Sequence, residues 1–146
     1  MKPLVVSSKE LSAVIHEQLE GRWWPVSGDP RHLPDLARGN YVLPKKKYVE
    51  WFLYYSKVDE IMREDAFKCD SYAVNLWAEW RKFGALDIWN NKYPFAGGMF
   101  RSVHALNWVV DEAGVLWIIE PQKDWLMLPQ PRNIRPAHWD IHFMAG

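Results

Sequence analysis

The chain has 146 residues, enough for one domain with a substantial core, and its 18 Lys and Arg residues equal its 18 Asp and Glu residues in number. This balance excludes a strongly basic, polyanion-binding protein, so we expect no nucleic-acid partner. The single Cys cannot form an internal disulfide, and no apolar run is long enough for a signal peptide or a membrane span. We therefore expect a single cytoplasmic domain with no membrane partner.

Aromatic residues are the unusual feature of the composition, with ten Trp, six Tyr and six Phe. A Trp ring suits a sugar or a peptide because it combines an apolar face with one N–H donor. Large aromatic side chains are nevertheless mostly buried, so we expect most of these rings to fill the core. We expect Trp23 and Trp24 to lie beside a binding groove, because residues 22–43 are rich in Pro and Gly and predict a long loop.

The first part of the chain, residues 1–84, is expected to be mainly helical. Ser7 and Glu10 have the spacing of a capping box, and the apolar residues after them recur at helical spacing. Pro44 fits the first position of a second helix, which is apolar nearly all round. A short helical or turn segment at 58–62 then leads to the helix that carries the only Cys.

This next helix is expected to begin near Cys69 and to end near Gly84. A thiol in the first turn of a helix faces unpaired backbone N–H groups and the positive end of the helix dipole. Both favour the thiolate, which is the nucleophilic form. A lone Cys is more often a small buried hydrophobic residue, so its place on the helix does not by itself identify a site.

The second part of the chain, residues 85–146, is expected to form mainly an antiparallel sheet. Alternating apolar residues predict one strand from Phe100 to Val110, and His104 lies within it. Further strands or extended pieces are expected at 115–122, 125–128 and 138–143. Helices followed by an antiparallel sheet indicate an α+β domain.

Cys69, His104 and Glu120 occur in the order of a nucleophile, a base and a carboxylate that orients the base. An even turn with Val110 opposite Val115 would put His104 and Glu120 on opposite faces of the sheet.

A three-residue loop ending in a left-handed Gly114 gives the other register. Asp111 then lies opposite Val115, and Leu106 lies opposite Glu120. In this register His104, Glu120 and Gln122 share a face of the sheet. Because Gly occupies the third loop position, we favour this register.

The segments KCDSYAVNLW, SVHALNWVVDEAG and LWIIEPQ resemble those around the active site of the papain-like cysteine protease domain of the Marasmius oreades agglutinin and its relatives, the agglutinin C-terminal domain family. The resemblance implies a papain-like α+β fold, in which the nucleophile begins a helix that packs on a small antiparallel sheet. It implies that Cys69 is the nucleophile, His104 the general base and Glu120 the orienting carboxylate, with Gln122 as a polar neighbour.

The resemblance implies a cysteine peptidase or amidase-like hydrolase that cleaves a peptide or isopeptide bond, with peptidoglycan as one substrate, through a thioester. We expect substrate or oxyanion support from Gln122, Asn107, Trp23 and Trp24. The alternative is a non-catalytic, Trp-rich binding module for a glycan or a protein partner. An inert, buried thiol would favour this binding module.

The residue pattern itself requires no cofactor, but the resemblance implies calcium. Asp70, Asp65, Asp59 and Glu60 are oxygen ligands near the expected place, with Asp70 and Asp65 as the expected metal ligands, although the sequence has no calcium-loop spacing. A rival metal site would use His138, Asp140 and His142 on one face of a strand. Alternating polar residues on an exposed strand explain that pattern as well.

Overall fold

The computed structural model describes residues 3–19, 36, 39–61, 68–102, 104–129 and 143–146. Its elements, in chain order, are β1 (Leu4–Ser7), α1 (Ser8–Gln18), β2 (Asn40–Leu43), α2 (Lys46–Tyr55), α3 (Val58–Ile61), α4 (Cys69–Gly84), the 3-10 helix η1 (Asp87–Trp89), β3 (Gly97–Arg101), β4 (Ala105–Val110), β5 (Leu116–Glu120), β6 (Trp125–Met127) and β7 (Phe143–Ala145). None of the described helices is long and apolar enough to cross a bilayer. The cytoplasmic location stays a prediction.

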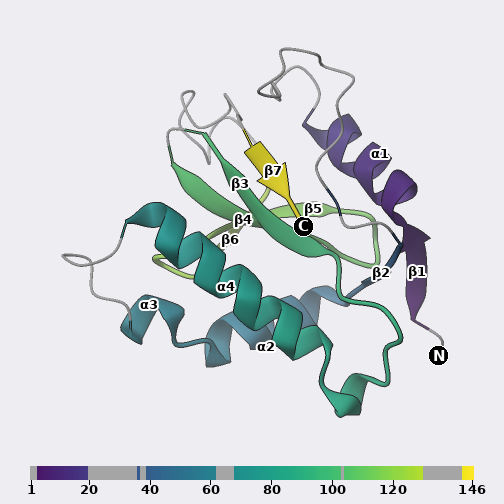
Figure 1. Cartoon of the computed structure of the whole chain (residues 1–146), viewed down its shortest axis with the longest axis horizontal. Helices are drawn as coiled ribbons and strands as arrows, with labels where there is room; N and C mark the ends of the chain where they lie inside the picture. Colours follow the sequence, from purple (N-terminus) through teal and green to yellow (C-terminus); the bar gives the residue numbers. More distant parts are fainter. Residues whose placement is uncertain (1–2, 20–35, 37–38, 62–67, 103, 130–142) are drawn as a thin grey trace.

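The larger sheet has the strand order β6-β5-β4-β3-β7, and every pair of neighbours in it is antiparallel. Strands β1 and β2 form a separate two-stranded sheet. In Figure 1, α1 lies beside β1 on one side of the molecule, whereas α4 crosses the larger sheet with α2 next to it.

The larger sheet is covered on both faces, because its strands alternate apolar side chains between two cores. Leu106 and Trp108 of β4 belong to the core that contains Leu11 and Ile15 of α1. On the other face, Val109 belongs to the core built with α2 and α4. The beginning of α4 is thereby held against the sheet.

The capping box predicted for the first helix is confirmed. The Ser7 hydroxyl accepts from the Glu10 N–H at 3.1 Å, and the Glu10 carboxylate accepts from the Ser7 N–H at 2.7 Å. Leu11 and Ile15 follow on the buried face of α1. These two reciprocal bonds satisfy the backbone N–H groups of Ser7 and Glu10, and so they determine where α1 begins.

The single strand predicted from Phe100 to Val110 is wrong, because the chain reverses within it. Arg101 of β3 lies opposite Ala105 of β4, and the Ser102 N–H donates to the His104 carbonyl at 2.9 Å in the turn between them. No Gly or Pro marks this turn, so the sequence does not reveal it. His104 therefore comes directly before β4.

The turn between β4 and β5 has the predicted three-residue form, and its register is confirmed. Gly114 is left-handed with φ +74°, and the Asp111 N–H donates to the Val115 carbonyl at 3.1 Å. Val110 lies opposite Leu116, and the same register continues along the two strands toward Glu120 at the far end of β5. This register brings the polar ends of the two strands together.

Candidate functional site

The structure brings His104 and Glu120 together at the end of the β4–β5 pair. His104 Nε2 lies 2.7 Å from Glu120 Oε2, and the two side chains are only 18% and 16% exposed. The hydrogen bond to Glu120 is the main cause that raises the pKa of His104, with partial burial opposing it. The two side chains that were expected to share a face of the sheet are therefore in contact, and their catalytic roles stay predictions.

Cys69 lies beside this pair as the first residue of α4. It is partly buried against a small cluster formed by Ala73, Met99 and Ala105. A hydrogen bond between the Cys69 side chain and His104 also raises the pKa of His104. Because Nε2 of His104 faces Glu120, Nδ1 is the ring nitrogen that remains for the thiol. A proton can pass from the sulfur to this ring, with the resulting charge stabilised by Glu120.

Two of the predicted supporting residues have other contacts. Asn107 is 2% exposed, and its amide donates to the Ala73 carbonyl at 2.8 Å and to the Gly98 carbonyl at 3.1 Å. The Gln122 backbone N–H donates to Glu120 Oε1 at 3.1 Å. Asn107 therefore joins α4 to the sheet, whereas Gln122 helps to hold the carboxylate that faces His104.

Most of the other predicted site residues lie outside the described part of the chain, and Asp70 makes a local hydrogen bond. Trp23, Trp24, Asp65 and the rival metal site at 138–142 lie outside the described residues. Asp70 Oδ1 accepts from the Ser71 N–H at 3.0 Å. Within the described part of the chain, no group of three or more His, Cys, Asp or Glu side chains is arranged to hold a metal ion. Calcium stays a prediction, and no step of the chemistry is assigned to it.

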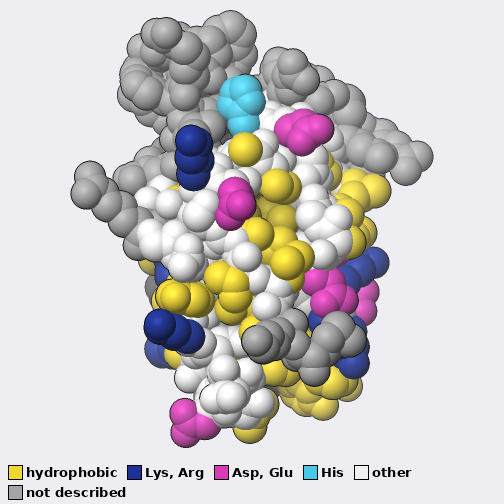
Figure 2. All heavy atoms as spheres, turned by 90° about the vertical axis from the view of Figure 1, so that its right-hand side faces the viewer, with side chains coloured by type: hydrophobic (Ala, Val, Ile, Leu, Met, Phe, Trp, Pro, Cys, Tyr) yellow, Lys and Arg dark blue, Asp and Glu magenta, His cyan; other side chains and the backbone are white. Residues whose placement is uncertain are grey.

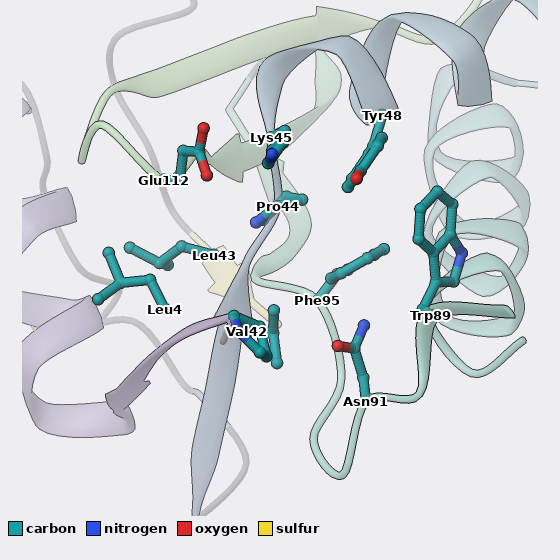
Figure 3. Close-up of a pocket in the computed structure, with 11 residues that line it drawn as sticks. Leu4, Val42, Leu43, Pro44, Lys45, Tyr48, Trp89, Asn91, Phe95 and Glu112 are labelled. Atoms are coloured by element: carbon teal, nitrogen blue, oxygen red, sulfur yellow. The ribbon is translucent and has the colours of Figure 1, made fainter. Parts of the chain in front are cut away.

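A pocket that the sequence analysis did not predict lies between β1, β2, the start of α2 and the segment around Trp89. Its volume is about 290 Å³, and its lining consists of Pro3, Leu4, Val42, Leu43, Pro44, Lys45, Tyr48, Trp89, Asn91, Phe95 and Glu112. In Figure 3, Tyr48 and Trp89 stand on one side of the pocket, and Leu4 and Leu43 stand on the other. The Tyr48 and Trp89 ring centroids are 4.3 Å apart, so the two rings form one aromatic wall.

Polar groups are distributed around this aromatic wall. Lys45 and Glu112 bring opposite charges to the lining, and the amide of Asn91 points toward the pocket in Figure 3. Trp89 Nε1 and Asn91 Nδ2 are buried atoms with no hydrogen-bond partner among the described residues. Buried donors are normally paired, so Asn91, whose amide points toward the pocket, is a candidate donor to a ligand's oxygen atom, whereas the Trp89 nitrogen lies on the far side of its ring in Figure 3.

Exposed apolar side chains gather on the molecular surface beside this pocket. Figure 2 shows yellow apolar side chains gathered across the middle of the side where α1 and β1 lie. Leu4 is 49% exposed and Val5 is 41% exposed on β1. The pocket was missed because four separate segments build it, and only the high aromatic content could have indicated it.

No family model matches the sequence, and a search of curated proteins finds no match. Several solved structures have a similar fold, including these two. The first, a PSL1a–E64 complex, has a TM-score of 0.65 and 16% identity, covering 97% of this chain and 49% of the other. The second is Polyporus squamosus lectin bound to the human-type influenza-binding epitope Neu5Acα2-6Galβ1-4GlcNAc, with a TM-score of 0.64 and 19% identity over 98% of this chain and 50% of the lectin. This chain shares the fold of about half a lectin chain.

This finding corrects the classification made from the sequence. The papain-like fold and the assignment to the protease domain of the agglutinin family are overturned, because the similar structures are of a lectin. The fold that they share with this chain is a small domain with a five-stranded antiparallel sheet and few helices. The resemblance depended on three short segments around Cys69, His104 and Glu120, which determine local geometry but not the class of protein.

The predictions that depended on this classification are corrected with it. The hydrolase and cysteine (thiol) protease classes are wrong, as is the peptide or peptidoglycan-like substrate. The similar lectin was solved with a glycan epitope, which is a different class of partner. The non-catalytic, Trp-rich binding module given as the alternative agrees better with these comparisons.

Proposed function

We propose that this domain is a tryptophan-rich module that binds a saccharide in the pocket lined by Tyr48 and Trp89. The observation that carries the proposal is the aromatic wall, whose two ring centroids lie 4.3 Å apart beside a cavity of about 290 Å³. Ligand pockets combine such apolar walls with a few polar groups that orient the ligand. The fold likeness to Polyporus squamosus lectin supports the same class of ligand.

A pyranose ring fits the chemistry of this lining. One face of a sugar ring carries C–H groups, which pack on aromatic faces, and its edges carry hydroxyl groups. Asn91, Lys45 and Glu112 supply both donors and acceptors for such hydroxyls. Asn91 Nδ2 has no hydrogen-bond partner among the described residues, so it is available to donate to a sugar oxygen. Burying these polar groups against hydroxyls avoids the cost of leaving them unpaired.

Glycan-array binding followed by titration calorimetry of the folded domain tests this proposal. We expect Asn91→Ala to weaken binding by about tenfold, which is the loss of one good hydrogen bond to a ligand. Trp125→Ala is the control, because Trp125 is 55% exposed on β6 and does not line the pocket. A folded wild-type domain that binds no glycan on the array would contradict the proposal.

A second candidate function rests on a different observation, the 2.7 Å contact between His104 and Glu120 beside Cys69. We propose that Cys69 is a reactive nucleophile, with His104 as its base and Glu120 as the carboxylate that orients the imidazole. The position of the thiol at the start of α4 and the hydrogen bond between the Cys69 side chain and His104 support this role.

Alkylation of Cys69 by iodoacetamide at pH 7 tests the second candidate. We expect rapid modification of the folded wild type and a rate at least tenfold lower in His104→Ala, because the thiol loses its base. A thiol that reacts only after the protein unfolds would rule out this candidate and leave the saccharide-binding proposal unaffected.

A further inference from the structure

An aromatic run leads out of the pocket along α2. The Trp89 and Tyr48 ring centroids are 4.3 Å apart, and those of Tyr48 and Trp51 are 5.6 Å apart. Tyr48 and Trp51 are three residues apart on a helix, so they occupy the same side of α2. Trp51 is 50% exposed, which places the outer end of the run at the surface.

The cavity is too small for more than a short ligand. Its volume of about 290 Å³ lies at the lower end of the range for small-molecule pockets, about 300–1,000 Å³. One sugar ring fills such a space, and any further sugar must lie outside it. Tyr48 borders both the pocket and Trp51, so the aromatic run provides a continuous path from the cavity to the surface.

The surface around Trp51 also has a polar donor. Lys47 Nζ lies 5.5 Å from the Tyr48 ring centroid and 5.7 Å from that of Trp51. Its neighbour Lys46 is paired with Glu50 at 3.5 Å. Lys47 can therefore swing to a ligand's hydroxyl group while its aliphatic stem stays on the rings.

We propose that the site takes an oligosaccharide, with one sugar in the pocket and the next stacked on Trp51. This inference rests on the proposed saccharide binding, and it specifies that the ligand has at least two sugar units. It also explains why a Trp on an exposed helix face is continuous with the aromatic wall. The second sugar contacts one ring face, so its contribution to affinity is about two- to tenfold.

Titration calorimetry with GlcNAc, Galβ1-4GlcNAc and Neu5Acα2-6Galβ1-4GlcNAc tests the inference, using wild type, Trp51→Ala and the control Trp125→Ala. In the wild type and in the control, affinity should rise about two- to tenfold between the monosaccharide and the longer glycans. In Trp51→Ala, the gain in affinity with glycan length should disappear.

The outcomes separate this inference from the proposed function. Monosaccharide binding with no gain for longer glycans, or a gain that Trp51→Ala leaves intact, would overturn the inference alone. If none of the three glycans binds to the folded wild type, both the inference and the saccharide-binding proposal are overturned. Far-ultraviolet circular dichroism of each variant confirms that a lost affinity does not reflect unfolding.

Discussion

His104 and Glu120 are sixteen residues apart in the chain, yet His104 Nε2 and Glu120 Oε2 meet at 2.7 Å. The three-residue loop before β5 produces this contact, because it sets β4 and β5 in a register that brings their far ends together. A shift of one residue would turn Glu120 to the other face of the sheet. One left-handed Gly114 therefore supports a polar contact at the opposite end of the hairpin.

The first prediction concerns the charge of His104. Replacing Glu120 with Gln removes the negative charge and leaves at most a weaker, neutral hydrogen bond to His104, whereas the burial that lowers the pKa of His104 remains. We therefore expect the pKa of His104 to fall in Glu120→Gln, as followed by the pH dependence of its imidazole NMR signals. An unchanged pKa would show that the Glu120 contact does not control the charge of His104.

The contact between His104 and Glu120 also predicts how the stability of the fold changes with pH. A His whose pKa is raised on folding binds its proton more tightly in the folded state, so it stabilises the fold at low pH. This stabilisation is fully present below about pH 6.5 and is lost as the pH rises through the raised pKa. The difference in Tm between wild type and Glu120→Gln should therefore shrink as the pH is raised from 6 to 9.

The second prediction concerns Asn107, which holds α4 against the sheet. Asn107→Ala removes both buried side-chain hydrogen bonds, to the carbonyls of Ala73 and Gly98, so we expect a loss of about 2–3 kcal/mol in the free energy of unfolding. Asn75→Ala is the matched control, because Asn75 makes one exposed side-chain bond to Ser71. Urea denaturation should show a change below about 0.5 kcal/mol for the control.

Local sequence signals predicted the local structure well. The Ser7–Glu10 capping box and the three-residue loop at Gly114 are confirmed, because each depends on a few adjacent residues with a specific backbone geometry. The turn after Arg101 was missed, since no Gly or Pro marks the reversal. The sequence analysis placed His104 within one long strand, whereas in the structure it lies in the turn between β3 and β4.

Long-range arrangement could not be predicted from these signals. Met144 of β7 pairs with Phe100 of β3 across forty-odd residues of sequence, and no pattern in either strand specifies the other. The aromatic pocket likewise joins Leu4, Tyr48 and Trp89 from separate segments. Classification from the segments around Cys69, His104 and Glu120 failed because these segments form only one part of the domain and do not specify how the rest is arranged.

The third prediction uses Asp124, in the turn between β5 and β6. Burial, the negative charge of Asp59, a hydrogen bond with Asp59 and the negative charge of Glu60 raise the pKa of Asp124 to about 7, from 3.8. The folded protein therefore keeps a proton that the unfolded chain releases above about pH 4, so stability should fall as the pH rises from 4 to 7. Above about pH 7 this contribution is constant.

Asp124→Asn isolates this effect. The amide keeps a donor for Asp59 and carries no charge, and Asn also tolerates the left-handed backbone at this position, where φ is +53°. We expect Asp124→Asn to raise Tm at pH 8 and to leave Tm at pH 4 nearly unchanged, as measured by differential scanning calorimetry across this range. Equal Tm values at pH 8 would contradict the raised pKa of Asp124.

The last prediction returns to Gly114. Its φ of +74° is strained for a residue with a Cβ, although the added atom would meet nothing within 4 Å. Gly114→Ala should therefore lower the free energy of unfolding by about 1 kcal/mol through backbone strain alone. Gly114→Asn should cost less, because Asn adopts the left-handed region more readily.

Two measurements on these variants separate strain from a change of register. Urea denaturation gives the loss of stability, and NMR titration gives the pKa of His104. If the register survives, the pKa of His104 stays raised in both variants, because the 2.7 Å contact with Glu120 persists. If Gly114→Ala shifts the register by one residue, Glu120 faces the other side of the sheet, and the pKa of His104 falls as it does in Glu120→Gln.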